Sequence, residues 1–313
     1  MFLSRKARYE GRTTMAANLA IQKRVGFIGL GIMGQHMAGH ILAGGYELHV
    51  NSRTRAKADA LVERGAIWYE SPGEVAATSD ILITIVGYPV DVESIYLEPG
   101  GILDRARPGA VLIDMTTSSP SLAERIAKAA SLRGMMALDA PVSGGDIGAR
   151  EAKLAIMAGG DETAFSQALP VLRLIGSNVV HMGQAGTGQH TKMANQIAIA
   201  STMIAVSESI SYATRVGLNP DLTLDVLGTG AASSFLLNGL GRKMVRQDFA
   251  PGFFVHHFAK DIGIALNEAK RINLDLPGLA LAQKMYERLL ANGFGEEGTQ
   301  ALYRIYNRLH WSE

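Results

Sequence analysis

Short apolar runs alternate with segments of helical periodicity between residues 23 and 187. The runs predict strands at residues 25–29, 46–50, 81–86, 111–114, 136–138, 154–158 and 178–182. The segments between them predict helices at residues 33–43, 56–64, 91–96, 121–133 and 162–174. Regular alternation of strand and helix is typical of an α/β fold with a doubly wound parallel sheet.

The pattern changes after residue 187, where no convincing strand follows. Helical spacing predicts helices at residues 190–216, 221–227, 234–246, 257–271, 279–292 and 298–308. The first of these is near the upper length of a globular helix, so we expect it to bridge two domains with a cleft beside its start. The predicted division is a leader at 1–22, an α/β domain at 23–187 and an all-α domain at 188–313.

The leader carries Arg5, Lys6, Arg8 and Arg12 but only one acidic residue, Glu10. It lacks the apolar core of a signal peptide, and its composition also occurs in organelle-targeting segments. We favour either a chain start at Met15 or a disordered leader, and exclude these residues from the fold. No run reaches the roughly 18 apolar residues of a membrane span, so we expect a soluble protein without a membrane partner.

The amino-acid composition excludes several classes of binding partner and of reactive side chain. Lys and Arg number 30 and Asp and Glu 29, which leaves a formal charge of +1 and no field to attract nucleic acid or anionic lipid. Cysteine is absent, which excludes disulfides, thiolate metal sites and thiol nucleophiles and is compatible with the cytoplasm. We therefore expect a cytoplasmic protein that binds a small molecule and borrows a cofactor for any redox chemistry.

A glycine-rich loop lies between the first predicted strand and the first helix. Its GxGxxG spacing allows a tight turn, close approach of a pyrophosphate and close helix packing, with the helix N-terminus facing the phosphates. A plain tight turn is the alternative. The surrounding strand, helix and second strand favour a Rossmann-type dinucleotide site formed by Gly29, Leu30, Gly31, Ile32, Met33 and Gly34.

The end of the second strand bears on the choice of dinucleotide. NAD-selective folds place an acidic residue there, but this chain has Ser52, Arg53 and Thr54. An arginine with two neighbouring hydroxyls is suited to a 2′-phosphate, so NADP is preferred over NAD. The alternative is that Arg53 and Arg55 are solvated loop charges.

Two further loops follow predicted strands at the side where a doubly wound sheet binds ligands. We expect them to contact the ribose and nicotinamide, although ordinary loop polar groups would look the same. The candidate residues are Val86, Gly87, Tyr88, Thr116 and Thr117.

Five blocks in order resemble the 3-hydroxyisobutyrate dehydrogenase-like, or β-hydroxyacid dehydrogenase, family. They are the loop of residues 29–34 with Met37 and Ala38 after it, the segments 114–120, 139–145 and 183–188, the last followed by Lys192 and Asn195, and the pair Lys260 and Asp261. The resemblance covers residues 24–309, nearly everything except the leader.

The resemblance implies that Lys192 is the catalytic residue and that Asn195 orients the substrate or the lysine. It also implies that Ser143, Gly144 and Gly145 bind a substrate carboxylate and that Lys260 contacts the cofactor. Lys192 and Asn195 are three residues apart, so they share one face of a helix. An ammonium there can give a proton to a carbonyl oxygen, and a neutral amine can take it back.

The implied activity is NAD(P)-dependent interconversion of a small β-hydroxy acid and its semialdehyde or keto form, by a homodimer or homotetramer. Other readings remain open: a reductase of another carbonyl or imine substrate, such as succinic semialdehyde or tartronate semialdehyde, or a non-catalytic NADP-binding module. The chain departs from many relatives at His40 and Ala152. Four of the eight histidines suggest a metal site, namely His181, His190, His256 and His257, but none is expected, because their spacing fits no tight ligand motif and no carboxylate pair accompanies them.

Overall fold

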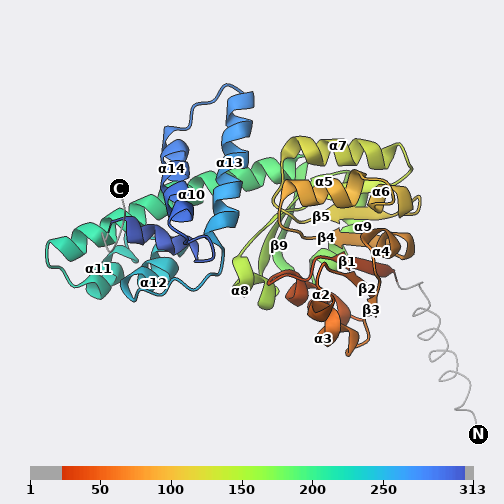
Figure 1. The fold of residues 1–313 in the computed structure, drawn as a ribbon, viewed down its shortest axis with the longest axis horizontal. Coiled ribbons are helices and arrows are strands. Elements are labelled where there is room, and N and C mark those ends of the chain that lie inside the picture. Colours follow the sequence, from red (N-terminus) through yellow and green to blue (C-terminus); the bar gives the residue numbers. More distant parts are fainter. Residues whose placement is uncertain (1–22, 307–313) are drawn as a thin grey trace, which may run out of the picture.

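The computed structural model describes residues 23–306 of the chain. A sheet flanked by helices and a body made of helices lie side by side, and one long helix, α10 (Thr187–Arg215), runs from the first into the second (Figure 1). The predicted division near residue 187 therefore coincides with the start of α10. The predictions for residues 1–22 and for the end of the last helix lie outside the described residues.

Nine strands form one sheet in the order β3-β2-β1-β4-β5-β6-β8-β7, and β9 pairs with β8. The strands from β3 to β6 pair in parallel, as predicted, but β8 runs antiparallel to β6 and β7. The connection from β6 to β8 lacks a crossover helix of the length that a parallel return needs, so this part of the sheet is mixed. The bounds are β1 Arg24–Ile28, β2 Glu47–Asn51, β3 Ile67–Trp68, β4 Ile81–Thr84, β5 Val111–Asp114, β6 Met136–Asp139, β7 Val142–Ser143, β8 Leu154–Gly160 and β9 Gly176–Gly183.

Helices cover both faces of this sheet. On one face lie α2 (Gly34–Ala43), the short η1 (Arg55–Ala58) and α3 (Asp59–Val62), and α9 (Glu162–Leu172). On the other face lie α4 (Pro72–Thr78), α5 (Pro89–Leu97), α6 (Ile102–Arg105) and α7 (Pro120–Ser131). The small helix α8 (Gly145–Arg150) follows β7.

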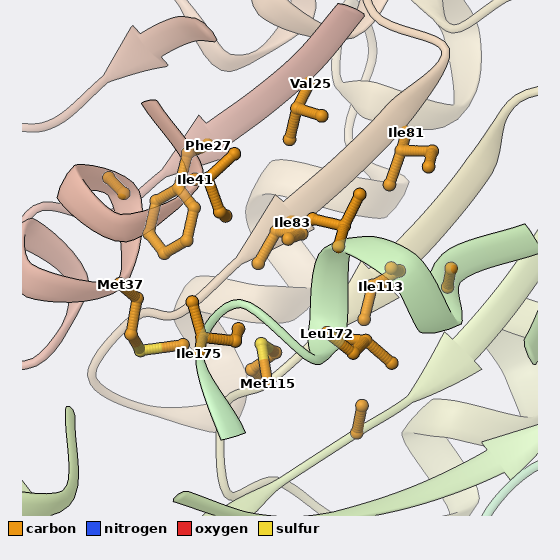
Figure 2. Close-up of a cluster of buried hydrophobic side chains, with 14 of the residues drawn as sticks. Val25, Phe27, Met37, Ile41, Ile81, Ile83, Ile113, Met115, Leu172 and Ile175 are labelled. Atoms are coloured by element: carbon orange, nitrogen blue, oxygen red, sulfur yellow. The ribbon is translucent and has the colours of Figure 1, made fainter. Parts of the chain in front are cut away.

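Alternation along the strands produces the two layers of the core. In β1, Phe27 points to the cluster that also holds Ile41 of α2 and Leu172 of α9 (Figure 2), whereas Ile28 points to the opposite cluster. Phe27 and Ile41 are fully buried, and each buried side chain of this size contributes about 1.5–3 kcal/mol. This core fixes the strand ends from which the ligand loops emerge.

The apolar pattern of the sequence does not predict the short helices α4, α6 and α8. For α4 a signal was present, because Ser71 and Glu74 form a capping box around Pro72. Elements of four to seven residues carry too few apolar positions for periodicity to reveal them. The predicted helix at residues 234–246 is interrupted by a π-helical turn, η2 (Leu237–Gly241), before α12 (Arg242–Val245).

The second body packs α11 (Pro220–Leu227), α13 (Val255–Arg271), α14 (Pro277–Ala291) and the 3₁₀ turn η3 (Thr299–Ile305) around α10. At its centre Phe258 and Tyr286 meet edge to face, with ring centroids 4.9 Å apart. By length and composition alone α10 would also pass as a membrane-spanning helix, the only one in the described part of the chain. It buries three polar side chains in its first half, Gln189, Lys192 and Gln196.

Candidate active site

The glycine loop has the geometry that a bound dinucleotide requires. Gly29 has a φ of +100° and donates from its N–H to the carbonyl oxygen of Asn51 at 3.0 Å. A Cβ at Gly29 would collide with the carbonyl oxygen of Ile85, and a Cβ at Gly34 would collide with that of Gly29. A Cβ at Gly31, by contrast, would point into open space. The first and third glycines are thus required by the protein's own packing, and the second faces space that a ligand can occupy.

The N-terminus of a helix lies directly after the glycine loop, beside the open space at Gly31. Helix α2 begins at Gly34 and has no acidic residue in its first turn, so the positive end of its dipole is not neutralised there. Ile32, at the tip of the loop, is 46% exposed. These residues fit the pyrophosphate of a dinucleotide.

Two arginines follow β2, and the sequence alone does not show which of them can bind a ligand. The Arg53 side chain is 87% exposed, and its one ion pair in the described structure, with Asp91 at 3.8 Å, is long. Arg55 is engaged, because it contacts Asp59 and lies over the ring of Trp68 at 4.7 Å. Ser52 Oγ accepts from the N–H of Leu30 at 3.4 Å, and Thr54 precedes η1. Arg53 is therefore the arginine available to a ligand.

The two predicted nicotinamide loops are joined by hydrogen bonds. The N–H of Val86 donates to Thr116 Oγ1 at 2.9 Å, and the N–H of Thr116 donates to Asp114 Oδ1 at 3.1 Å. Thr84 Oγ1 also donates to Asp114 Oδ1 at 2.9 Å. Burial raises the pKa of Asp114 to about 6, against the opposing effect of these hydrogen bonds.

Lys260 reaches these loops from α13 in the helical body. Its Nζ donates to the carbonyl oxygens of Thr117 at 2.8 Å and Gly87 at 3.3 Å, and it lies 5.9 Å from the centre of the Tyr88 ring. It also forms an ion pair with Asp261 at 3.0 Å. The residue predicted to contact the cofactor thus links the helical body to the two loops predicted to hold the nicotinamide end.

Lys192 is buried in the second turn of α10. Its Nζ donates to the carbonyl oxygen of Val142 at 2.9 Å. Burial lowers the pKa of Lys192 to about 8, helped by the nearby Lys260 and opposed by Asp261. Near neutral pH the amine can therefore exchange a proton.

The carbonyl that Lys192 contacts belongs to the residue before Ser143, so the lysine lies beside the predicted carboxylate loop. Gly144 and Gly145 have φ angles of +132° and +63°, values that side chains other than glycine rarely adopt. They lead into α8, whose first residue is Gly145. The fold brings these three residues and Lys192 together.

Asn195 belongs to a chain of side chains that ends on a buried carboxylate. Its Nδ2 donates to Gln196 Oε1 at 2.8 Å, and Gln196 Nε2 donates to Asp261 Oδ2 at 2.7 Å. Gln196 and Asp261 are almost fully buried. Because a carboxylate only accepts, it fixes the direction of both amides.

Two further buried residues of this region, Asp139 and Gln189, had no role assigned from the sequence. Asp139 accepts from the N–H groups of Gly186 at 2.7 Å and Gln189 at 2.8 Å, and burial raises its pKa to about 7. Asp139 opened one of the family blocks, but nothing in the sequence singled out Gln189. The His257 ring lies instead beside the loop after β4, with its centroid 5.6 Å from that of Tyr88, and burial lowers the pKa of His257 to about 4.

The two departures from the family pattern have structural explanations. His40 Nε2 lies 3.0 Å from the carbonyl oxygen of Arg150, which ties α2 to the end of α8. Ala152 has a φ of +55°, so a glycine at this position would relieve backbone strain. His181 and His256 contact backbone carbonyl oxygens, those of Gly160 and Gly295.

Comparison with known protein families agrees with this geometry. Residues 24–183 match the NAD binding domain of 6-phosphogluconate dehydrogenase, and residues 186–306 match the NAD-binding domain of NADP-dependent 3-hydroxyisobutyrate dehydrogenase. The chain is 50% identical over 288 residues to a probable 3-hydroxyisobutyrate dehydrogenase-like protein of Arabidopsis thaliana, covering 92% of this chain and 86% of the relative. It is 38% identical to the 2-hydroxy-3-oxopropionate reductase of Escherichia coli, covering 89% of this chain and 95% of the relative.

A solved structure extends the likeness to the whole fold. The Mycobacterium tuberculosis 3-hydroxyisobutyrate dehydrogenase, solved with L-serine, superposes with a TM-score of 0.84 at 28% identity, covering 92% of this chain and all of the other. The predicted family and fold class are therefore confirmed, and the protein is an NAD(P)-binding oxidoreductase. The chain belongs to the 3-hydroxyisobutyrate dehydrogenase-like family of hydroxyacid dehydrogenases.

Proposed function

We propose that the protein interconverts a small β-hydroxy acid and its semialdehyde or keto form, with Lys192 as the general acid and base. The observation that carries the proposal is the buried Lys192 amine, which lies against Val142 beside the glycine turn at Gly144 and Gly145. The nicotinamide cofactor supplies or accepts the hydride when it is bound.

Lys192 performs the proton transfer in both directions. In reduction, its ammonium donates a proton to the carbonyl oxygen of the substrate, which becomes the hydroxyl. In oxidation, the neutral amine removes the hydroxyl proton. A pKa of about 8 suits both roles, because each protonation state is well populated within one pH unit of that value.

Ser143, Gly144 and Gly145 hold the carboxylate of the substrate. A hydroxyl and backbone N–H groups that no Cβ shields form a suitable cradle for an anion. Because Val142 accepts from Lys192, a substrate held by the next residues lies near the amine. Asn195, oriented by Gln196, contacts the substrate or the lysine from the same face of α10.

The preferred cofactor in this proposal is NADP. The support is Arg53, which is exposed after β2 where an acidic residue would favour NAD.

We also propose that subunits pair through the helical domain. Three apolar side chains on its surface, Tyr212, Val226 and Phe235, are each at least 70% exposed. Light scattering at several protein concentrations measures the number of subunits.

The proposed substrate class is a short hydroxy acid with a primary or secondary alcohol near its carboxylate. A screen compares 3-hydroxyisobutyrate, the substrate in the name of the Arabidopsis relative, with 2-hydroxy-3-oxopropionate, that of the Escherichia coli relative. A γ-hydroxy acid is a third candidate. Production or consumption of the reduced cofactor is followed by absorbance.

Replacement of Lys192 tests the mechanism. We expect Lys192→Ala to lower kcat by at least about 10²-fold while the Kd of the cofactor changes little. Lys153→Ala is a matched control, because Lys153 is an exposed lysine beyond α8 that pairs with Glu151. Full activity of Lys192→Ala would refute the assignment. Cofactor binding without turnover on any substrate in the wild type would favour a non-catalytic module.

A further inference from the structure

A buried glutamine joins the helix that carries Lys192 to one of the loops predicted to hold the nicotinamide. Gln189 Oε1 accepts from the N–H of Ser118 at 3.0 Å, and its Nε2 donates to the carbonyl oxygen of Thr116 at 2.7 Å. The residue has no exposed surface. One side chain thus satisfies a backbone donor and a backbone acceptor of the same loop.

The beginning of α10 is fixed on its other side by the sheet. Asp139, at the end of β6, accepts from the N–H groups of Gly186 and Gln189. A Cβ at Gly188 would collide with the carbonyl oxygens of Asp139 and Met157, so the helix backbone presses directly on β6 and β8. The first turn of α10 therefore cannot shift toward the strands.

Lys192 follows Gln189 by three residues and lies on the same face of the helix. Any change in how Gln189 meets Thr116 and Ser118 therefore alters the separation between the lysine and that loop. Thr116 in turn accepts from the N–H of Val86, so the same glutamine also bears on the loop after β4.

We propose that Gln189 is a positioning residue that sets the distance and angle between the Lys192 amine and the nicotinamide loops. The inference rests on the proposed role of Lys192. It assigns to Gln189 no contact with substrate or cofactor, and it predicts that loss of the two side-chain hydrogen bonds impairs chemistry more than cofactor binding.

The first variant removes both hydrogen bonds and keeps the volume. In Gln189→Met we expect kcat to fall about 10- to 100-fold, the effect of a misplacement near 1 Å, while the Kd of the cofactor stays close to that of the wild type. Because hydride transfer becomes the slow step, the isotope effect with deuterated reduced cofactor should rise. Ser207→Ala is the matched control, since it removes another fully buried polar group from α10, far along the helix.

The second variant restores the hydrogen bonds in one protonation state. A protonated glutamic acid at residue 189 can donate to Thr116 and accept from Ser118, whereas its carboxylate can only accept. The charged groups around this segment come from every element packed on it. They are Asp114 on β5, which accepts from the N–H of Thr116, Asp139 on β6, which accepts from that of Gln189, Lys260 on α13, which donates to Thr117, Lys192 on α10, and Glu124 on α7, which lies against Gly186. We expect Gln189→Glu to be active at low pH and to lose activity through an ionisation that neither the wild type nor Gln189→Met shows.

A third measurement does not depend on activity. The reactivity of the Lys192 amine toward an acylating reagent, followed against pH by mass spectrometry, reports its pKa. In Gln189→Met we expect this pKa to rise from about 8 toward the ordinary value of 10.5, because a displaced lysine regains water.

The outcomes separate this inference from the proposed function. Active Lys192→Ala would refute the role of the lysine. Inactive Lys192→Ala together with a Gln189→Met variant that matches Ser207→Ala in kcat and isotope effect would refute the positioning role alone. An unchanged labelling profile of Lys192 in Gln189→Met would also overturn it, whatever the activity. A Gln189→Glu variant with the pH profile of the wild type would contradict the hydrogen-bond mechanism.

Discussion

Arg53 is the residue on which the choice between NADP and NAD depends. Its side chain is 87% exposed, and its ion pair with Asp91, at 3.8 Å, is long. Such a pair contributes little to stability, so Arg53→Ala should leave the free energy of unfolding within about 0.5 kcal/mol of the wild type. The substitution therefore tests binding without disturbing the fold.

The magnitude follows from the hydrogen bonds that a guanidinium makes to a phosphate. Hydrogen bonds to charged groups contribute about 1.5–3 kcal/mol, and solvent screening at so exposed a position favours the lower end. A loss of about 2 kcal/mol corresponds to a roughly 30-fold weaker Kd for NADPH. NADH lacks the 2′-phosphate, so its Kd should change by less than about threefold.

Fluorescence titration of NADPH and NADH measures these constants for the wild type, Arg53→Ala and Arg55→Ala. Arg55 is the matched control, because it is a neighbouring arginine already engaged by Asp59 and Trp68. The effect of Arg53→Ala on NADPH should shrink as salt concentration rises. An equal loss for both cofactors, or a larger effect of Arg55→Ala, would refute the assignment of the 2′-phosphate to Arg53.

Three further predictions concern the amine and the glycine loop. The kcat/KM for oxidation should rise with pH through about pH 8, because oxidation needs the neutral Lys192 amine. The kcat/KM for reduction should fall over the same range, because reduction needs the ammonium. Profiles that are flat between pH 7 and 9 would contradict both expectations. In unfolding experiments Lys192→Met should stabilise the protein at pH 7 by up to about 3 kcal/mol, because the wild type buries a charged amine at that pH. The pKa of Lys192 is about 8 in the folded protein and 10.5 in the unfolded chain, so this cost is constant below pH 8 and disappears as the pH rises from 8 to 10.5. A gain in stability that persists above pH 11 would contradict this explanation. Gly31→Ala should keep the melting temperature and weaken the cofactor, whereas Gly34→Ala should lower the melting temperature, because only at Gly34 would the new Cβ collide with backbone; equal melting temperatures for the two variants would contradict the packing argument.

Local sequence patterns determined the larger part of the architecture. The strands β1, β4 and β5 are buried runs of four or five residues, and the long helix α10 follows from sustained helical spacing. The glycine spacing at residues 29–34 predicted the dinucleotide loop, because glycine is needed wherever backbone approaches backbone or phosphate so closely. These features depend on neighbours in the chain, so the sequence contains them directly.

The antiparallel direction of β8 could not be predicted from local sequence patterns. Its apolar run predicts a strand, but pairing with β6 in the antiparallel sense depends on the short connection through β7 and α8, neither of which has a clear local signal. The availability of Arg53 rather than Arg55 was likewise open, since both follow the same strand. Only the positions of Asp59 and Trp68 distinguish them.

The sequence by itself determined the two-part architecture, the phosphate loop and, through its resemblance, the candidate residues Lys192 and Asn195. Tertiary structure alone decided the environment of Lys192, whose burial against Val142 sets its pKa. It also joined Gln189 to Thr116, 73 residues away in the chain. Hydrogen bonds and desolvation depend on which distant segments meet in space, and no local pattern specifies these meetings.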